Sequence, residues 1–207
     1  MFITFEGSEG SGKTSQIPAL AQILNESGYN LLTTREPGGT HIGNQIRSIL
    51  SDQGNIAMEA RTESLLFLAA RAQLVSEVIV PHLKAQGIVI SDRYADSTLA
   101  YQGYGRELDL DQLRVLLAFA TCGLEPDLTL LLDMDVEEGL RRRLKGGDLN
   151  RLDVLELEFY KRVRHGYLAM ARANPERWVI IDAAGPPDQV QEDIRRIVLE
   201  RLRLRFK

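Results

Sequence analysis

The chain has 207 residues, of which 44% are apolar and 26% are charged, and this predicts a single globular domain over residues 1–207 with a substantial core. A formal net charge of −4 argues against a nucleic-acid partner, because such proteins need a basic surface to replace counterions. The lone cysteine, Cys122, excludes an intrachain disulfide and fits a reducing compartment, and we expect its side chain to be buried. Apolar runs such as "LTLLLDM" are too short to cross a bilayer, which predicts a cytoplasmic protein with no membrane partner.

Short apolar runs alternate along the chain with longer amphipathic ones, the pattern of a parallel sheet covered by helices. We expect strands at residues 1–6, 30–35, 87–92, 127–133 and 177–182. Helices are expected at residues 13–27, 41–50, 59–85, 109–122, 135–144, 153–173 and 187–204. The predicted strands end in charged residues, and ligands of such sheets bind outside the carboxyl ends of the strands. A functional site is therefore expected at these strand ends.

The segment "GSEGSGKT", residues 7–14, follows the first predicted strand and opens the first predicted helix. It completes the pattern G-x-x-x-x-G-K-[ST], whose glycines let backbone N–H groups wrap around phosphates. Lys13 would reach the outer phosphates, and the Thr14 hydroxyl would hold Mg²⁺. Together with the alternation of elements, the motif predicts a P-loop NTPase fold of three layers, a five-stranded parallel sheet flanked by helices. We expect the triphosphate to contact the whole loop: Gly7, Ser8, Glu9, Gly10, Ser11, Gly12, Lys13 and Thr14.

Arginines at the predicted strand ends indicate a second phosphate. Arg35 ends the second strand, Arg93 follows the third, and Arg47 lies on the short helix between them. Guanidinium groups match phosphate oxygens in a bidentate fork, so several of them near a triphosphate imply a phosphorylated acceptor. Asp92 ends the third strand in the manner of a carboxylate that orients the waters of a metal ion. No Asn-Lys-x-Asp guanine reader occurs in the chain, which argues against a GTPase switch.

The basic stretch "RRRLKGGDLNRLD", residues 141–153, leaves a predicted helix and passes through a Gly-Gly pair. A loop of this composition is typical of a short mobile lid that closes over a triphosphate and stabilises charge on the transferring group. A phosphate acceptor also explains why no catalytic histidine pattern is found. A phosphomonoester with a second pKa of about 6 is already an ionised nucleophile near neutral pH.

These motifs resemble the bacterial branch of the thymidylate kinase family. The segments "FITFEGSEGSGKT", "TREPGGT", "LLFLAARAQLV", "SDRYADSTLAYQGYGR", "PDLTLLLD" and "NRLD" follow the order of the family over nearly the whole chain. The resemblance implies a transferase that moves the γ-phosphoryl group of ATP to dTMP, giving ADP and dTDP for dTTP biosynthesis. It also implies dependence on magnesium and assembly as a homodimer.

The resemblance further implies individual roles. Phe67 would stack on thymine and Arg71 would donate to a base carbonyl. Tyr101 would crowd the 2′ position of the sugar, and Glu9 would reach the acceptor's 3′-hydroxyl. The full set of implied dTMP-binding residues is Glu9, Arg35, Arg47, Phe67, Arg71, Arg93, Ser97, Thr98, Tyr101 and Gln102.

Family members with glutamate at the Glu9 position place a catalytic arginine in the lid. Arg142 and Arg143 are the candidates, with Arg151 nearby, and they join Lys13 and Arg93 as the predicted catalytic residues. Leu144 and Gly146 stand where some relatives carry further arginines, so the choice among the three stays open. The segment "DAAGPPDQV" matches the part of the family that flanks adenine.

Two other functions remain compatible with the residues. One is a kinase for another nucleoside monophosphate or for a deoxynucleoside. The other is a non-catalytic nucleotide-sensing module, which would bind ATP without forming dTDP. Assays with a panel of nucleosides and nucleoside monophosphates would distinguish these functions.

Overall fold

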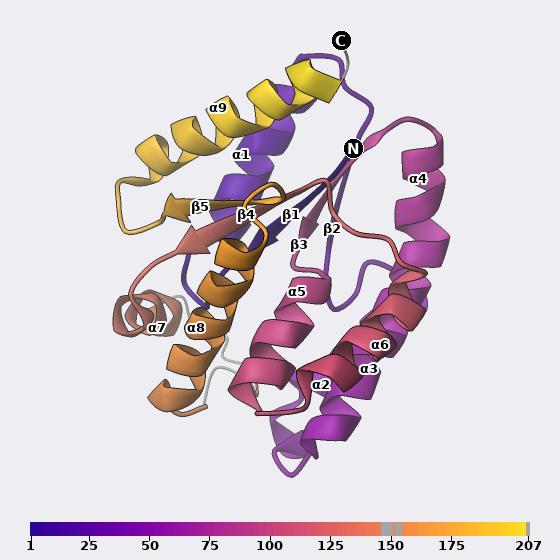
Figure 1. Ribbon diagram of the computed structural model, residues 1–207, viewed down its shortest axis with the longest axis vertical. Helices are drawn as coiled ribbons and strands as arrows, with labels where there is room; N and C mark the ends of the chain where they lie inside the picture. Colours follow the sequence, from indigo (N-terminus) through magenta and orange to yellow (C-terminus); the bar gives the residue numbers. More distant parts are fainter. Residues whose placement is uncertain (146–150, 152–154, 206–207) are drawn as a thin grey trace.

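The protein is described by a computed structural model that covers residues 1–145, 151 and 155–205. Its centre is a five-stranded, all-parallel sheet in the order β2-β3-β1-β4-β5 (Figure 1). The strands are β1 (Phe2–Glu6), β2 (Leu31–Arg35), β3 (Ile88–Asp92), β4 (Leu128–Asp133) and β5 (Trp178–Asp182). The predicted α/β class and the five predicted strands are confirmed.

The helices agree with the predicted spans, with small shifts at their ends. They are α1 (Lys13–Glu26), α2 (His41–Ser51), α3 (Ala60–Leu74), α4 (Val80–Lys84), α5 (Ala95–Thr98), α6 (Leu110–Thr121), α7 (Val136–Lys145), α8 (Leu157–Ala173) and α9 (Pro187–Arg205). A 3₁₀ turn, η1 (Gln53–Asn55), and two π-helical segments, η2 (Val75–Ile79) and η3 (Leu99–Gly105), complete the list. The long helix expected at 59–85 is α3, η2 and α4 in succession.

Two expectations from the sequence differ from the structure. The helical stretch of α5 and η3 was not predicted, because "DSTLAYQGYG" is rich in residues that favour turns. Cys122 is exposed rather than buried. It ends α6 with a φ of 50°, in the left-handed conformation that turns the chain away from the helix and outward.

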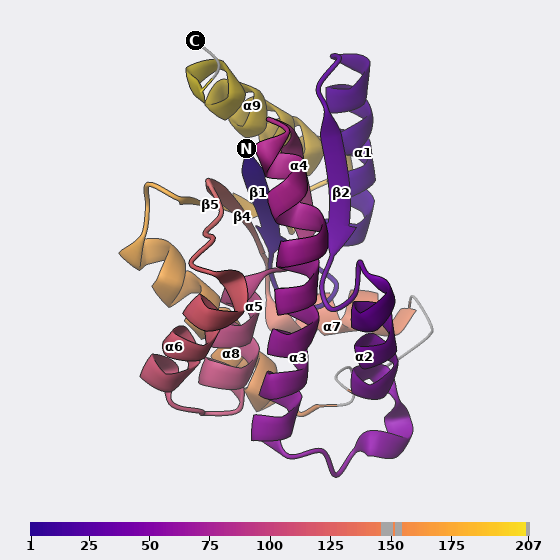
Figure 2. The ribbon, with the colours of Figure 1, turned by 90° about the vertical axis from the view of Figure 1, so that its right-hand side faces the viewer.

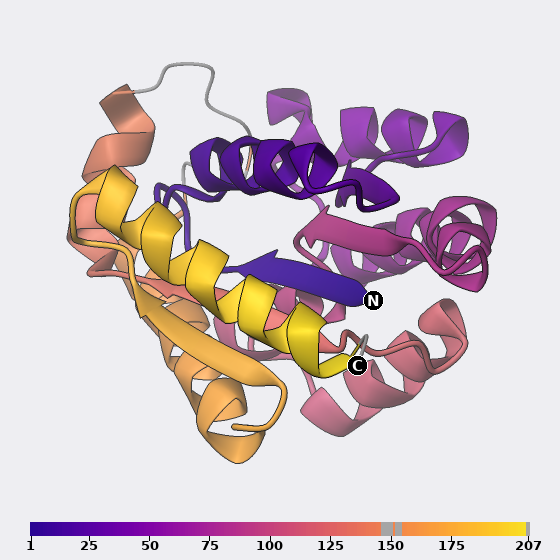
Figure 3. The same ribbon diagram turned by 90° about the horizontal axis from the view of Figure 1, so that it is seen from above.

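The two faces of the sheet are covered by different helices. On one face, α1 and α9 pack side by side over β1, β3 and β4, with fully buried Leu20, Leu24 and Ile194 in the contact. On the other face, η2 lies over β1 and β3, and α8 packs against η3 and β4. The N-terminus and the end of α9 lie close together (Figures 1 and 3). The carboxyl ends of the parallel strands share the opposite edge of the sheet from the N-terminus.

The helices α2, α3 and α6 form a layer outside the strand ends. Figure 2 shows α2 beside α3, and Leu68 of α3 meets Leu117 and Ala120 of α6 in a small buried cluster. Among the described residues, one helical stretch, Ala60–Lys84, is long and apolar enough to span a membrane. It carries the buried charges Glu63 and Arg71 and packs on the sheet through Leu74, as core helices of soluble proteins do.

Candidate active site

The P-loop connects β1 to α1 in a conformation that its glycines permit. Gly7, Gly10 and Gly12 have φ values of 141°, 72° and 93°, a region that side chains with a Cβ rarely adopt. Helix α1 begins immediately afterwards at Lys13. The unpaired N–H groups of the first turn of α1 therefore point toward the loop, as an anion site requires.

Lys13 is held inside this loop. Its Nζ donates to the Gly7 carbonyl at 2.9 Å, the Ser8 carbonyl at 3.0 Å and the Ser11 hydroxyl at 3.1 Å. Burial, and then the neighbouring Arg93, lower the pKa of Lys13 to about 8. The ammonium group is thus desolvated next to another cation, an arrangement that a bound polyanion would relieve.

A single cavity of about 760 Å³ joins the P-loop to the ends of β2 and β3. Its rim is formed by α2, α3, η3 and α7. Of the residues predicted for the site, the cavity is lined by Glu9, Gly10, Ser11, Gly12, Lys13, Thr14, Arg35, Arg47, Phe67, Arg71, Asp92, Arg93, Ser97, Thr98, Tyr101, Gln102, Arg142 and Arg143. Gly7, Ser8 and Arg151, which were also predicted for the site, do not line the cavity.

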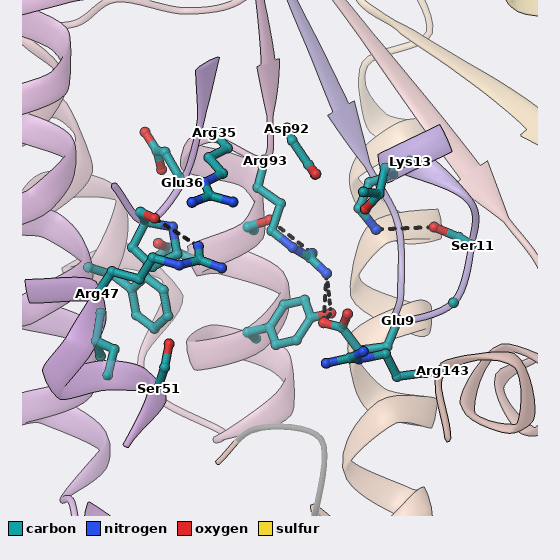
Figure 4. Close-up of a pocket in the computed structure, with 18 of the residues that line it drawn as sticks. Glu9, Ser11, Lys13, Arg35, Glu36, Arg47, Ser51, Asp92, Arg93 and Arg143 are labelled. Carbon is teal, nitrogen blue, oxygen red and sulfur yellow. Dashed lines mark hydrogen bonds and ion pairs between the residues drawn. The ribbon is translucent and has the colours of Figure 1, made fainter. Parts of the chain in front are cut away.

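Arg93 lies between the two halves of the cavity. Figure 4 shows Lys13 and Ser11 on one side of it and Arg35 and Arg47 on the other. Its backbone has a φ of 69°, an uncommon conformation for a residue with a Cβ. This turn at the end of β3 sends the guanidinium group across the carboxyl end of β1, to the Gly7 carbonyl at 3.1 Å.

The same guanidinium group also binds Glu9. Arg93 Nη2 donates to Glu9 Oε1 at 2.7 Å and to the Tyr101 hydroxyl at 3.0 Å, and Tyr101 donates to Glu9 Oε1 at 2.9 Å. Burial raises the pKa of Glu9, but Arg93 and Lys13 outweigh it and hold the pKa below its usual range. Glu9 therefore carries a negative charge and points out of the P-loop toward the second half of the cavity (Figure 4).

Arg71 is the largest fully buried side chain, with 1% exposure. Its Nε donates to Glu36 at 2.7 Å, Nη1 to Thr98 Oγ1 at 2.8 Å and Nη2 to the Tyr94 carbonyl at 2.9 Å. A guanidinium group has five N–H donors, and Nη2 also lies 2.5 Å from Glu36 Oε2, so one N–H of Nη1 is left for a ligand. Phe67 lies one helical turn earlier and lines the same part of the cavity.

Glu36 was not predicted. It follows Arg35 in "TREPGGT", and its only signal in the sequence is its place at the strand end. Burial raises its pKa although Arg71 acts in the opposite direction. Its Oε1 atom is buried without a hydrogen-bond partner.

Arg35 and Arg47 form a basic corner of the cavity. Arg47 Nη1 donates to the Pro37 carbonyl at 2.9 Å. Burial, and then Arg35, lower the pKa of Arg47, so the two positive charges disfavour each other. An anion such as a phosphate would compensate both charges.

The donors for a metal ion are one carboxylate and one hydroxyl. The Oδ1 atom of Asp92 is buried without a hydrogen-bond partner, and Thr14 is exposed at the first turn of α1. Within residues 1–145, 151 and 155–205, no group of three or more His, Cys, Asp or Glu side chains could hold a metal. The donor set of one carboxylate and one hydroxyl fits Mg²⁺, which takes one or two carboxylates and otherwise binds phosphates and water.

The three candidate lid arginines lie in different places. Arg142 donates to the carbonyl of Ala183 at 3.2 Å, which belongs to the segment expected beside adenine. Arg143 lies beside Glu9 (Figure 4). Arg151 is 3% exposed and donates to Glu63 at 2.6 Å and to the Leu50 carbonyl at 3.1 Å. The other residues of the expected lid after Lys145, including Gly146, lie outside the described residues.

A parallel sheet with a P-loop at the carboxyl end of its central strand, beside a second cluster of arginines, defines a P-loop phosphotransferase. A sequence model described as thymidylate kinase matches residues 5–194. Thymidylate kinases from Herpetosiphon aurantiacus and Roseiflexus castenholzii are 47% and 50% identical over 219 and 211 aligned positions, covering 94% and 96% of this chain and 93% and 92% of each relative. A crystal structure of thymidylate kinase from Ehrlichia chaffeensis superposes with a TM-score of 0.77 at 36% identity, covering 96% of this chain and 98% of the other. The chain belongs to the thymidylate kinase family.

Helix α7 touches the tip of the P-loop through two glycines. A Cβ on Gly139 would lie 2.5 Å from the Glu9 carbonyl, and a Cβ on Gly10 would lie 1.9 Å from the Gly139 carbonyl. Real Cβ atoms do not approach other atoms so closely, so the two backbones can be in contact only because both residues are glycine. The helix that bears Arg142 and Arg143 therefore supports the P-loop directly.

We expect Gly139→Ala to weaken ATP binding about tenfold, because the added methyl group displaces either the loop or α7. Alanine favours a helix over glycine by about 1 kcal/mol, so the melting temperature should change little. Isothermal titration calorimetry with ATP and a thermal melt measure the two effects. Glu137→Ala, an exposed change on the same helix, is the control, and unchanged ATP affinity in Gly139→Ala would contradict the contact.

Proposed function

We propose that this protein transfers the γ-phosphoryl group of ATP to dTMP, forming ADP and dTDP. The observation that carries the proposal is the single cavity in which a P-loop with Lys13 faces a basic corner formed by Arg35 and Arg47. Two phosphate sites in one cavity suit transfer between two phosphorylated molecules. Membership in the thymidylate kinase family supports dTMP as the acceptor.

The donor occupies the P-loop. Backbone N–H groups of residues 7–14 and the first turn of α1 bind its phosphates, and Lys13 moves from its loop partners to the outer phosphates. Thr14 and the unpartnered oxygen of Asp92 would hold Mg²⁺. When bound, the ion supplies charge neutralisation at the β- and γ-phosphates. The segment after β5, which Arg142 holds at Ala183, lies beside the adenine ring.

The acceptor occupies the other half. Arg35 and Arg47 bind its phosphate, Phe67 stacks on the base, and the remaining N–H of Arg71 donates to a base carbonyl. Ser97, Thr98 and Gln102 surround the base, and the Tyr101 ring excludes a 2′-hydroxyl. Glu9 accepts a hydrogen bond from the 3′-hydroxyl, which its direction out of the P-loop supports.

An oxygen of the acceptor phosphate attacks the γ-phosphorus, and the bond from that phosphorus to the bridging oxygen of ADP breaks. The attacking phosphate is already ionised, since its second pKa is about 6, so no general base is required. Lys13 and Arg93 stabilise the charge that is spread over the transferring group. Of the three lid arginines, Arg143 is best placed to join them, because it lines the cavity beside Glu9.

We further propose that residues 1–207 form one kinase domain with a lid segment at 141–153. The reaction would take place in the cytoplasm, where ATP and dTMP are available and a free cysteine remains reduced.

A homodimer is proposed through the outer face of α3 and α6. These packed helices carry exposed apolar side chains: Leu65 at 56% exposure, Val115 at 71% and Phe119 at 84%. Apolar side chains gathered on one surface are typical of an interface, and a second copy would bury them.

We expect Lys13→Ala to lower kcat on the order of a thousandfold while the fold is kept, because charge stabilisation carries the rate. The measurement is ADP release coupled to NADH oxidation, with ATP and each nucleoside monophosphate in turn, and with thymidine. Loss of dTDP formation when EDTA removes magnesium is expected when dTDP is measured directly by chromatography. Activity on thymidine would instead indicate a deoxynucleoside kinase. ATP binding without any dTDP would indicate a nucleotide sensor.

Glu9→Ala should raise the KM for dTMP at least tenfold and leave the affinity for ATP within threefold, because Glu9 faces the acceptor. Glu9→Gln is the matched variant that keeps the volume and removes the charge. Steady-state kinetics and equilibrium ATP binding give both quantities. An equal loss of ATP affinity would show that the carboxylate acts on the donor side.

Phe119→Glu should convert the dimer to a monomer, because a charge at the centre of an apolar interface is left unpaired. Light scattering after size-exclusion chromatography measures the mass. Leu204→Glu, at 68% exposure on α9, is the control and should leave the mass unchanged. A dimer that survives Phe119→Glu would place the interface elsewhere.

A further inference from the structure

Glu6 is a fully buried carboxylate that accepts hydrogen bonds from three donors. It ends β1 with 0% exposure and is not among the described residues that line the cavity. Its Oε1 accepts the backbone N–H of Tyr94 at 2.8 Å. Its Oε2 accepts the hydroxyls of Ser97 at 2.6 Å and Tyr167 at 2.8 Å. These donors come from the start of α5 and from α8, so two parts of the chain that are far apart in sequence converge on one side chain.

The first of these bonds fixes the backbone next to Arg93. A left-handed conformation costs a residue with a Cβ about 1–2 kcal/mol and persists only when its surroundings hold it. The N–H of Arg93 donates to the Phe5 carbonyl at 3.0 Å, and the N–H of Tyr94 donates to Glu6. The backbone on both sides of the Arg93 Cα atom is thus tied to the end of β1.

The other two bonds orient the groups that hold the Arg93 side chain. Arg93 Nη1 donates to Tyr167 Oη at 3.2 Å and lies 3.4 Å from Ser97 Oγ. A hydroxyl oxygen accepts a hydrogen bond through its lone pairs. When the hydrogens of the Ser97 and Tyr167 hydroxyls point to Glu6, the lone pairs of both oxygens face Arg93. The two hydroxyls also lie 2.9 Å apart, so either could donate to the other; an ionised Glu6 that accepts both hydrogens sets the direction that suits Arg93.

We propose that Glu6 is a positioning residue for phosphoryl transfer, which holds Arg93 in place through its backbone and through the Ser97 and Tyr167 hydroxyls. The proposal rests on the function proposed above. Glu6 touches no reacting atom, and its effect passes through Arg93.

The surroundings of Glu6 contain charges of both signs. Asp96 of α5 faces it from one side but is itself paired with Arg177 at 2.6 Å, while Arg93 and Lys13 supply positive charge from the other side. Burial, and then Asp96, raise the pKa of Glu6 to about 7, against the opposing effects of Arg93, Ser97 and Tyr167.

Glu6→Gln is the decisive variant, because it keeps the volume and replaces an acceptor by an NH₂ group. If the amide oxygen of the glutamine still accepts a hydrogen bond from the Tyr94 N–H, its NH₂ group donates to the two hydroxyls. Their hydrogens then turn toward Arg93. We expect kcat to fall 10- to 100-fold, the KM for ATP to stay within threefold, and a crystal structure to show Arg93 displaced from Glu9. In an Arg93→Ala background the same change should lower kcat less than twofold further, because the positioned group is gone.

Asp96→Asn is the matched control, since it also removes a buried carboxylate charge beside Glu6 but has no contact with Arg93. Its kcat should stay within twofold of the wild type. If Glu6→Gln does not fold, Tyr167→Phe removes one of the two hydroxyls and should lower kcat three- to tenfold with an unchanged KM for ATP.

The proposal is overturned if Glu6→Gln keeps kcat within twofold, or if its loss is fully retained in the Arg93→Ala background. An undisplaced Arg93 in the crystal structure would also overturn it. If the wild type forms no dTDP, the proposed function fails, and the crystal structure of Glu6→Gln still decides whether Glu6 positions Arg93.

Discussion

The arrangement of the whole site depends on one interaction, the placement of the Arg93 guanidinium group across the end of β1. Arg93 directly follows β3, yet it donates to the Gly7 carbonyl of the P-loop and to Glu9. A cation that bridges the two halves would compensate the charge of both phosphates that are proposed to bind there. The left-handed backbone at Arg93 is what makes this reach possible.

The same end of the molecule concentrates buried charge, and several of these charges are compensated by pairing. Arg71 lies against Glu36, and Glu63, with 0% exposure, receives Arg106 at 3.0 Å and Arg151 at 2.6 Å. Charges removed from water are tolerated only with such partners. These pairs link α3 to the residues that directly follow β2 and η3 and to residue 151, so they would hold in place the groups that are proposed to contact a base.

Local patterns predicted the strands, most helices and the P-loop, because these depend on periodicity and on spacing within a few residues. The motif residues Lys13 and Arg93 do line one cavity. Partners that meet only through the tertiary fold could not be found this way. Glu63 and Tyr167 lie in helices where the sequence shows ordinary amphipathic positions, and their contacts span 88 and 161 residues along the chain.

The ionised form of Glu6 weakens the fold near neutral pH. Burial raises its pKa to about 7 from the usual 4.5, so folding favours the protonated form. The stability that this group contributes is full below its unfolded pKa and is lost as pH rises through its folded pKa. An apolar residue or a neutral amide at this position would avoid that loss. A carboxylate at this position is explained if its charge serves the reaction rather than the stability of the fold. The hydrogen bonds of Glu6 give that charge a role, because they orient the Ser97 and Tyr167 hydroxyls around Arg93.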